Sequence, residues 1–236
     1  MRVRMPGAYN GTVNNRPGHV VRRKDGDVIA DLTEHRIVHR GIEVDLSRLS
    51  AVAAEFSATP MALVDVRWDA LRTYLAALSQ TITSHRRVDT GCLAELLTAL
   101  TGAPANSQSD QTPQLIRLLD DAQDIVVASG GPPGDQVGAR LATVLAEAAH
   151  VAGALFARQE QVVFPLILEY MNGVDYRWVQ GQFRAELPGG LLAFVAAWTV
   201  RHATGEEVLV LTDPSLCVTQ RIFAQRFAIT EGLLFG

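Results

Sequence analysis

Inward-facing residues recur at alternating steps of four and three along four long stretches of this chain, and segments rich in glycine and proline separate the stretches. Such spacing lines up side chains on one face of an α-helix. It predicts four helices at about residues 27–57, 61–101, 112–129 and 134–171. In the last of them the predicted stripe contains Leu141, Leu145, Ala148, Ala152, Leu155, Gln159, Val162 and Leu166. The predicted fold is therefore all-α, an up-down-up-down four-helix bundle.

The segments on either side of the predicted bundle differ from it. Residues 1–24 are rich in Gly, Asn, Pro and Arg and have no helical periodicity, so we expect an extended N-terminal segment. The bundle is expected at 25–172 and a C-terminal helical extension at 173–236. Helices of the extension are predicted near 176–186, 189–202 and 213–231. The second of these is apolar nearly all round, so we expect it to be buried against the bundle or against a partner.

Composition argues against several classes of function. Charged residues make up 19% of the chain and the net charge is −4, so we expect no nucleic-acid partner. The longest apolar run, residues 189–200, is shorter than the roughly 20 residues that a membrane span needs, so we expect no membrane segment. Cys92 and Cys217 are too few to staple a fold of this size, which is typical of a cytoplasmic protein.

Polar residues interrupt the middle of three predicted stripes: His35 and His39 in the first helix, His85 and Asp89 in the second, and Gln159 with its neighbour Glu160 in the fourth. A buried imidazole or carboxylate without a partner costs several kcal/mol, so these groups must find each other, a ligand or a metal. Residues four apart share a helix face, so each His pair or His–Asp pair can point two donors at one place. Three imidazoles and a carboxylate suit iron, manganese or zinc, and a self-satisfied hydrogen-bond network is the alternative.

Three stretches carry a resemblance to a known family: "DLTEHRIVHRGIEVDLSRL", "YLAALSQTITSHRRVDTGCLAELL" and "GALFARQEQVVFPLILEYM". Together they resemble the hemerythrin-like (HHE cation-binding) proteins, in particular the longer actinobacterial type with a helical C-terminal extension. The likeness covers about residues 22–172. It implies a four-helix bundle that holds two non-haem irons with five histidines and two bridging carboxylates.

The family pattern implies candidate metal ligands on three helices. His35 matches the histidine of the first helix, His85 and Asp89 match the second, and Glu160 matches the second bridging carboxylate of the fourth. His39 shares the helix face of His35 and is the fifth candidate.

The chain departs from the family pattern at several positions. Ala122, Val126 and Leu155 stand where the family has histidines, and Arg86 and Thr90 replace polar residues of the second helix. The chain therefore has a degenerate ligand set. Either a single ion binds to the half of the site built from the first two helices, or the core is repacked and metal-free.

Three hypotheses of function follow from this partial site. The resemblance implies a non-haem iron protein with a partial, mononuclear site that reacts with or senses O2, peroxide or NO. The second hypothesis is a metal-free binding or regulatory module, with the extension as the surface for a protein partner or a homodimer. The third is an enzyme that uses the core as a pocket for an organic ligand, with His35, His39 and His85 as acid and base groups.

Overall fold

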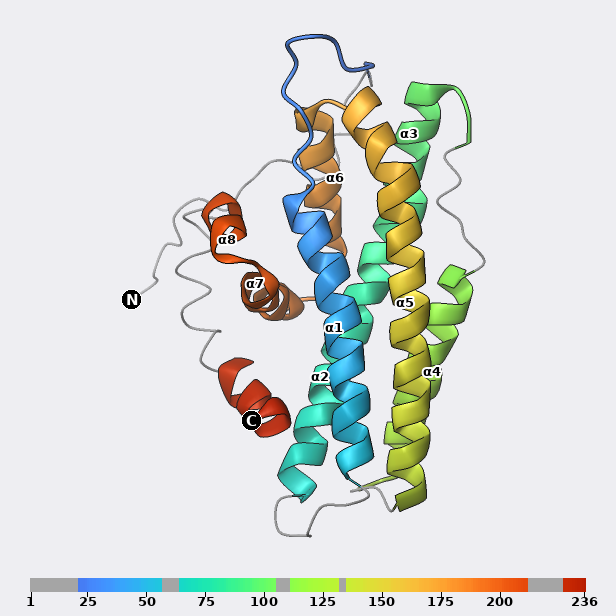
Figure 1. Cartoon of the computed structure of the whole chain (residues 1–236), viewed down its shortest axis with the longest axis vertical. Coiled ribbons are helices and arrows are strands. Elements are labelled where there is room, and N and C mark those ends of the chain that lie inside the picture. Colours follow the sequence, from blue (N-terminus) through green and yellow to red (C-terminus); the bar gives the residue numbers. More distant parts are fainter. Residues whose placement is uncertain (1–20, 57–63, 105–110, 132–134, 212–226) are drawn as a thin grey trace.

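The computed structural model describes residues 21–56, 64–104, 111–131, 135–211 and 227–236, which form helices joined by short connections (Figure 1). Within these ranges there is no β-strand, and a single isolated bridge joins Ile29 to Asn172. The prediction of an all-α chain is confirmed for this part of the sequence. Residues 1–20 of the predicted extended segment and most of the predicted helix 213–231 lie outside the described residues, although 227–235 are helical.

The helices of the described ranges are α1 (Thr33–Glu55), α2 (Val64–Val88), the π-helical turn η2 (Asp89–Leu93), α3 (Ala94–Thr101), α4 (Gln111–Ala128), α5 (Asp135–Tyr170), α6 (Gly173–Glu186), α7 (Leu191–His202) and α8 (Gly205–Leu211). The predicted second helix, 61–101, corresponds to α2, η2 and α3 in succession. The residues on either side of η2, Val88 and Ala94, keep right-handed helical dihedral angles, so one rod continues through the π turn.

The first helix begins at Thr33 and not at the predicted residue 27. The carbonyl of Val28 accepts a hydrogen bond from the N–H of Gly173 at 2.6 Å, so this stretch pairs with the chain after α5 and is not helical. Just before it, Gly26 has a φ of 92°, a left-handed conformation that is typical of a turn. A turn forms around it, in which the backbone N–H of Lys24 donates to Oδ2 of Asp27 at 2.8 Å. The hydrophobic periodicity of this stretch therefore overestimates the helix at its N-terminal end.

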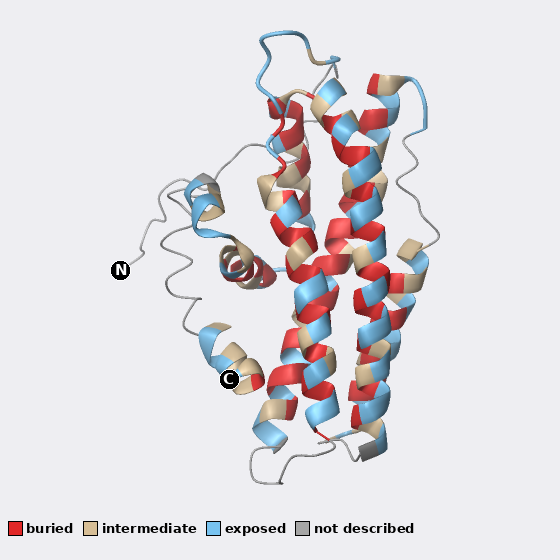
Figure 2. Cartoon of the chain, in the orientation of Figure 1, coloured by how far each residue is buried: buried red, intermediate tan, exposed pale blue. Residues whose placement is uncertain are grey.

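The four long helices pack side by side with their apolar stripes inward. α1 packs against α5 and α2, and α4 packs against α5 and α2. In Figure 1, α1, α2, α4 and α5 run alternately down and up the long axis of the molecule. Figure 2 shows that the buried residues line the sides on which these helices face each other. The centre of this core contains Ile42, Leu46, Leu49, Leu71, Leu75, Leu78, Leu115, Leu119, Leu141 and Leu145.

The predicted stripe of the fourth helix is correct as far as Gln159 and wrong beyond it. Val162 is 50% exposed, whereas Val163 and Ile167 are buried. Buried positions in this part of α5 follow at consecutive steps of four, so the buried face turns around the helix axis and leaves the predicted stripe, which kept a strict 3.5-residue repeat. Gln136–Tyr170 is also the one described helix long and apolar enough to cross a membrane, which is weak evidence because buried core helices share these properties.

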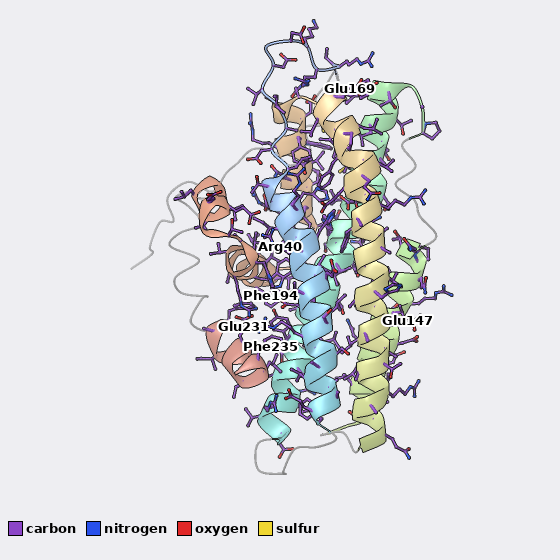
Figure 3. The ribbon with its side chains drawn as sticks, viewed as in Figure 1. Arg40, Glu147, Glu169, Phe194, Glu231 and Phe235 are labelled. Carbon is purple, nitrogen blue, oxygen red and sulfur yellow. The ribbon has the colours of Figure 1, made fainter. Side chains whose placement is uncertain are left out.

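The helices after α5 pack back onto the long helices. α6 packs on α2, α7 packs on α1 and α2, and α8 packs on α1. The apolar helix predicted at 189–202 corresponds to α7, and its Trp198 is fully buried. Arg40 of α1 reaches towards α8, where its guanidinium binds Glu207 at 2.6 Å (Figure 3). The apolar face of α7 is therefore covered by the chain's own helices.

A buried carboxylate fixes α7 to α1. Asp45 of α1 accepts hydrogen bonds from the hydroxyl of Tyr74, from Nε1 of Trp198 (2.8 Å) and from Nε2 of His202 (3.0 Å). Burial alone would raise the pKa of Asp45, but the bonds from His202, Tyr74 and Trp198 hold that pKa below its ordinary value. Phe194 and Phe235 close over this region (Figure 3), and both rings contact Tyr74.

The side chain of Trp198 in α7 packs against a glycine in α1, so a substitution of this glycine tests the packing of α7 on α1. A Cβ at Gly41 would lie 2.6 Å from Cζ2 of Trp198. We expect Gly41→Ala to lower the free energy of unfolding by about 1–3 kcal/mol through overpacking. The measurement is denaturant unfolding of the two proteins.

Gly181→Ala is the matched control for that substitution. It places a Cβ in α6 with no atom within 4 Å, so we expect a neutral change or a gain of up to about 1 kcal/mol from helix propensity. Equal effects of the two substitutions would contradict the packing of Trp198 on Gly41.

Candidate metal centre

Four of the five candidate ligands from the sequence converge at one point in the core. His35, His39, His85 and Asp89 are all buried, and each offers a donor atom that lies within 4.8 Å of the other three. The centroid of the His35 imidazole ring lies 4.7 Å from the ring centroid of His39 and 4.7 Å from that of His85. His35 and His39 come from α1, His85 from the last turn of α2, and Asp89 from the first residue of η2.

The spacing within each pair explains this convergence. Residues four apart on α1 stack on one face, and the same holds for His85 and Asp89 across the start of the π turn. Nε2 of His85 lies 3.3 Å from Oδ2 of Asp89, and Nε2 of His35 lies 3.6 Å from Oδ1. Two donors on a tetrahedral metal with bonds of about 2.0–2.1 Å lie about 3.3 Å apart. These separations therefore suit two ligands of one ion.

In two of the histidines, the outer nitrogen, Nδ1, carries the proton and donates a hydrogen bond. The inner nitrogen, Nε2, which faces the point of convergence, therefore keeps a lone pair that can bind a metal. Nδ1 of His39 donates to the carboxylate of Glu160 at 2.9 Å, which leaves the lone pair on Nε2. Nδ1 of His35 lies 2.8 Å from the hydroxyl of Tyr176, and the amide nitrogen of Gln159 approaches Nε2 of His35 at 3.4 Å. Because that amide nitrogen can only donate, Nδ1 of His35 carries the proton and donates to Tyr176.

Two of the inner nitrogens have no hydrogen-bond partner. Nε2 of His39 and Nε2 of His85 are buried and form no hydrogen bond with any of the described residues. Buried polar atoms of this kind are uncommon in native proteins and call for a physical explanation. A metal ion at the point where the three histidines meet would satisfy both.

Burial keeps these imidazoles neutral, which is the form that binds a metal. Burial lowers the pKa of His35 and His39, and it lowers the pKa of His85 to about 3. Asp89 is ionised: burial would raise its pKa, but His85 and His35, once protonated at acid pH, and at all pH values the guanidinium of Arg86 and the hydrogen bond from Gln159 hold that pKa below its ordinary value. The site therefore offers three neutral nitrogens and one anionic carboxylate at neutral pH.

Arg86 is a buried partner of the site, although in the sequence it stands out only as a departure from the family pattern. Its Nη1 donates to Oδ2 of Asp89 at 3.0 Å and to Oε1 of Gln159 at 2.7 Å, and its Nη2 donates to Thr112 at 3.0 Å. Gln159 in turn donates to Oδ2 of Asp89 at 2.9 Å. An arginine three residues before an acidic residue on a predicted stripe was the available signal, since such a pair shares a helix face.

Glu160, the fifth candidate, is not among the converging donors. Its side chain is 38% exposed, and it holds the far nitrogen of His39. Tyr176, which holds His35, lies in α6 beyond the predicted bundle, and no spacing within the bundle could have indicated it. Glu160 and Tyr176 therefore orient the histidines from outside the point of convergence.

The positions where the resemblance expects further histidines are part of the apolar core. Ala122, Val126 and Leu155 are all buried among hydrophobic residues. His150 is exposed on α5. On the α5 side, the ring of Phe156 stacks on His39 with centroids 4.2 Å apart. The donors thus occupy one side of the core only.

A small cavity of about 30 Å³ borders the converging donors, and His35, His85, Asp89, Tyr176 and Phe183 line part of it. That volume suffices for a water molecule or a ligand of similar size.

No protein-family model, curated protein or solved structure matches this chain.

The low pKa of His85 predicts how the stability of the metal-free protein depends on pH. In the unfolded chain His85 binds a proton below about pH 6.5, whereas in the native state it does so only below about 3. Its contribution to stability is therefore complete above pH 6.5 and is lost as the pH falls through this window. We expect the free energy of unfolding to fall by about 1.4 kcal/mol per pH unit more steeply in wild type than in His85→Gln.

The measurement is denaturant unfolding in the presence of a chelator, from pH 7 to about 4. Glu231, whose pKa is raised to about 7 mainly by burial, gives the opposite slope, but it is common to both proteins and cancels in the difference. Parallel curves would show that His85 is not held neutral by burial.

Proposed function

We propose that this chain is a metal-binding protein of the hemerythrin-like class that holds a single divalent ion of the first transition row. Its ligands would be Nε2 of His35, His39 and His85 and a carboxylate oxygen of Asp89. The observation that carries the proposal is the pair of buried, unpartnered Nε2 atoms of His39 and His85 beside an ionised Asp89. Three imidazoles and one carboxylate form a donor set suited to iron, manganese or zinc.

The arrangement of the long helices supports the hemerythrin-like part of the proposal. α1, α2, α4 and α5 pack around a shared core, and the donors face inward from two of them. Bundle cores are where helical proteins build such sites. The four-helix bundle and the family are proposals that rest on this packing and on the residues themselves.

We propose iron as the resident ion and O2, peroxide or NO as the small molecule that it meets. A bound iron would supply a redox-active centre with coordination positions beyond the four protein donors. The protein's own part is to hold the donors: Glu160 fixes the ring of His39, and Tyr176 fixes the ring of His35. The cavity of about 30 Å³ favours a ligand of a few atoms over an organic substrate, since organic ligands need about 300 Å³ or more.

A metal-free binding or regulatory module is the second candidate, and one observation favours it. Arg86 and Gln159 already satisfy Oδ2 of Asp89, so the carboxylate does not need a metal to be stable in the core. On this alternative the three histidines form a neutral, partly unsatisfied cluster, and the function lies on the surface, with a protein partner or second copy at the extension. A cytoplasmic location is proposed for either candidate.

Metal content separates the two candidates. After loading with Fe²⁺ under anaerobic conditions and removal of excess, we expect elemental analysis to find close to one ion per wild-type chain. His85→Ala removes a donor and should lower the metal content to near background. The same loading with Mn²⁺ and Zn²⁺ tests the choice of ion.

His150→Ala is the matched control, because His150 is an exposed histidine on α5 away from the site. It should retain the wild-type metal content. Wild-type protein that holds no ion after all three loadings would favour the metal-free module.

A further inference from the structure

The two oxygens of Asp89 have different surroundings. Oδ2 accepts hydrogen bonds from Nη1 of Arg86 at 3.0 Å and from the amide of Gln159 at 2.9 Å. Oδ1 lies on the side of Nε2 of His35, at 3.6 Å. Oδ2 also lies 3.3 Å from Nε2 of His85, but its two hydrogen bonds compete with a metal ion for its lone pairs.

We infer that Arg86 and Gln159 act as a clamp on Oδ2, so that Asp89 binds the metal through Oδ1 alone. The inference rests on the proposed metal site and adds a specificity-determining role for Arg86 that the ligand set does not contain. The clamp fixes the carboxylate as a monodentate ligand and limits the protein to four donor atoms.

The clamp is held in place by contacts of its own. Arg86 is 2% exposed, and its Nη2 donates to the hydroxyl of Thr112 at the start of α4. The amide oxygen of Gln159 accepts from Nη1 at 2.7 Å while its nitrogen donates to Asp89, which closes a ring of hydrogen bonds across α2, η2 and α5. A bidentate Asp89 would compete with both hydrogen bonds to Oδ2 and so weaken the pairing of a buried guanidinium, which is unfavourable.

The positive charge of Arg86 also acts on the metal directly. Because the guanidinium neutralises Asp89, a bound divalent ion would meet three neutral imidazoles and a carboxylate whose charge is already shared. Removing the guanidinium should therefore have two effects together: Asp89 becomes free to bind through both oxygens, and the metal binds more tightly.

The test uses full-length protein labelled with ¹³C at the aspartate carboxylates and loaded with Zn²⁺, which is redox-inert. An infrared difference spectrum, zinc-loaded minus zinc-free, reports the separation of the antisymmetric and symmetric carboxylate stretches. This separation is wide for a monodentate and narrow for a bidentate carboxylate. We expect a wide separation in wild type and a narrow one in Arg86→Met, with Zn²⁺ bound about tenfold more tightly by the variant.

Two further variants provide a matched control and an independent test of the clamp. Arg87→Met is the matched control, because Arg87 is the neighbouring arginine but lies at the surface and pairs with Glu186. It should give the wild-type spectrum. Gln159→Met removes the amide half of the clamp without a change of charge, so it tests the inference even if Arg86→Met does not fold, and it should narrow the separation.

The outcomes distinguish this inference from the proposed function. If wild type binds Zn²⁺ with a narrow separation, or if Gln159→Met and every folded variant at position 86 keep the wide one, the clamp is overturned while the metal site stands. If wild type binds no metal ion, both are overturned. A wide separation in wild type and in Arg87→Met that narrows in the clamp variants supports the inference.

Discussion

An ionised carboxylate, Asp89, lies in the middle of an apolar helical core, and the arrangement around it follows from the cost of that burial. Arg86 and Gln159 bind one of its oxygens, and three neutral imidazoles gather near it. The π turn η2 begins at Asp89, and π turns of this kind often occur at functional sites. One part of the site is therefore a polar cluster whose hydrogen bonds are satisfied. The other part is the group of imidazoles, in which two nitrogen atoms have no hydrogen-bond partner among the described residues.

A second carboxylate is buried further along α1, and different residues bind it. Asp45 is also a buried carboxylate: Tyr74, Trp198 and His202 donate to its Oδ2, and Arg48 donates to its Oδ1 at 3.2 Å, with no unpartnered nitrogen among these described residues. The contrast is informative, because it shows that this chain can satisfy a buried acid fully with hydrogen-bond donors. Nε2 of His39 and Nε2 of His85 are left without partners at the other site, and this points to a ligand there.

Much of the fold could be predicted from the sequence, because long stripes of leucine dictate both helix and burial. Prediction failed where short-range features override the stripe, as at the turn around Gly26, and where a strict 3.5-residue repeat drifts from a helix, as after Gln159 on α5. Three histidines and Asp89 could be grouped because they interrupt stripes at matching depth. Tyr176 and the partners of Asp45 could not, since their contacts join helices far apart in the sequence.

The central claim, a single ion held by three imidazoles and one carboxylate, is tested most directly by X-ray absorption at the K edge of the bound metal. For the zinc-loaded protein we expect three imidazole nitrogens and one oxygen at about 2.0–2.2 Å, with the multiple-scattering pattern of three histidine rings. His35, His39, His85 and Asp89 account for all four donors. A shell of water oxygens with one imidazole or none would mean that the ion sits elsewhere and would contradict the account.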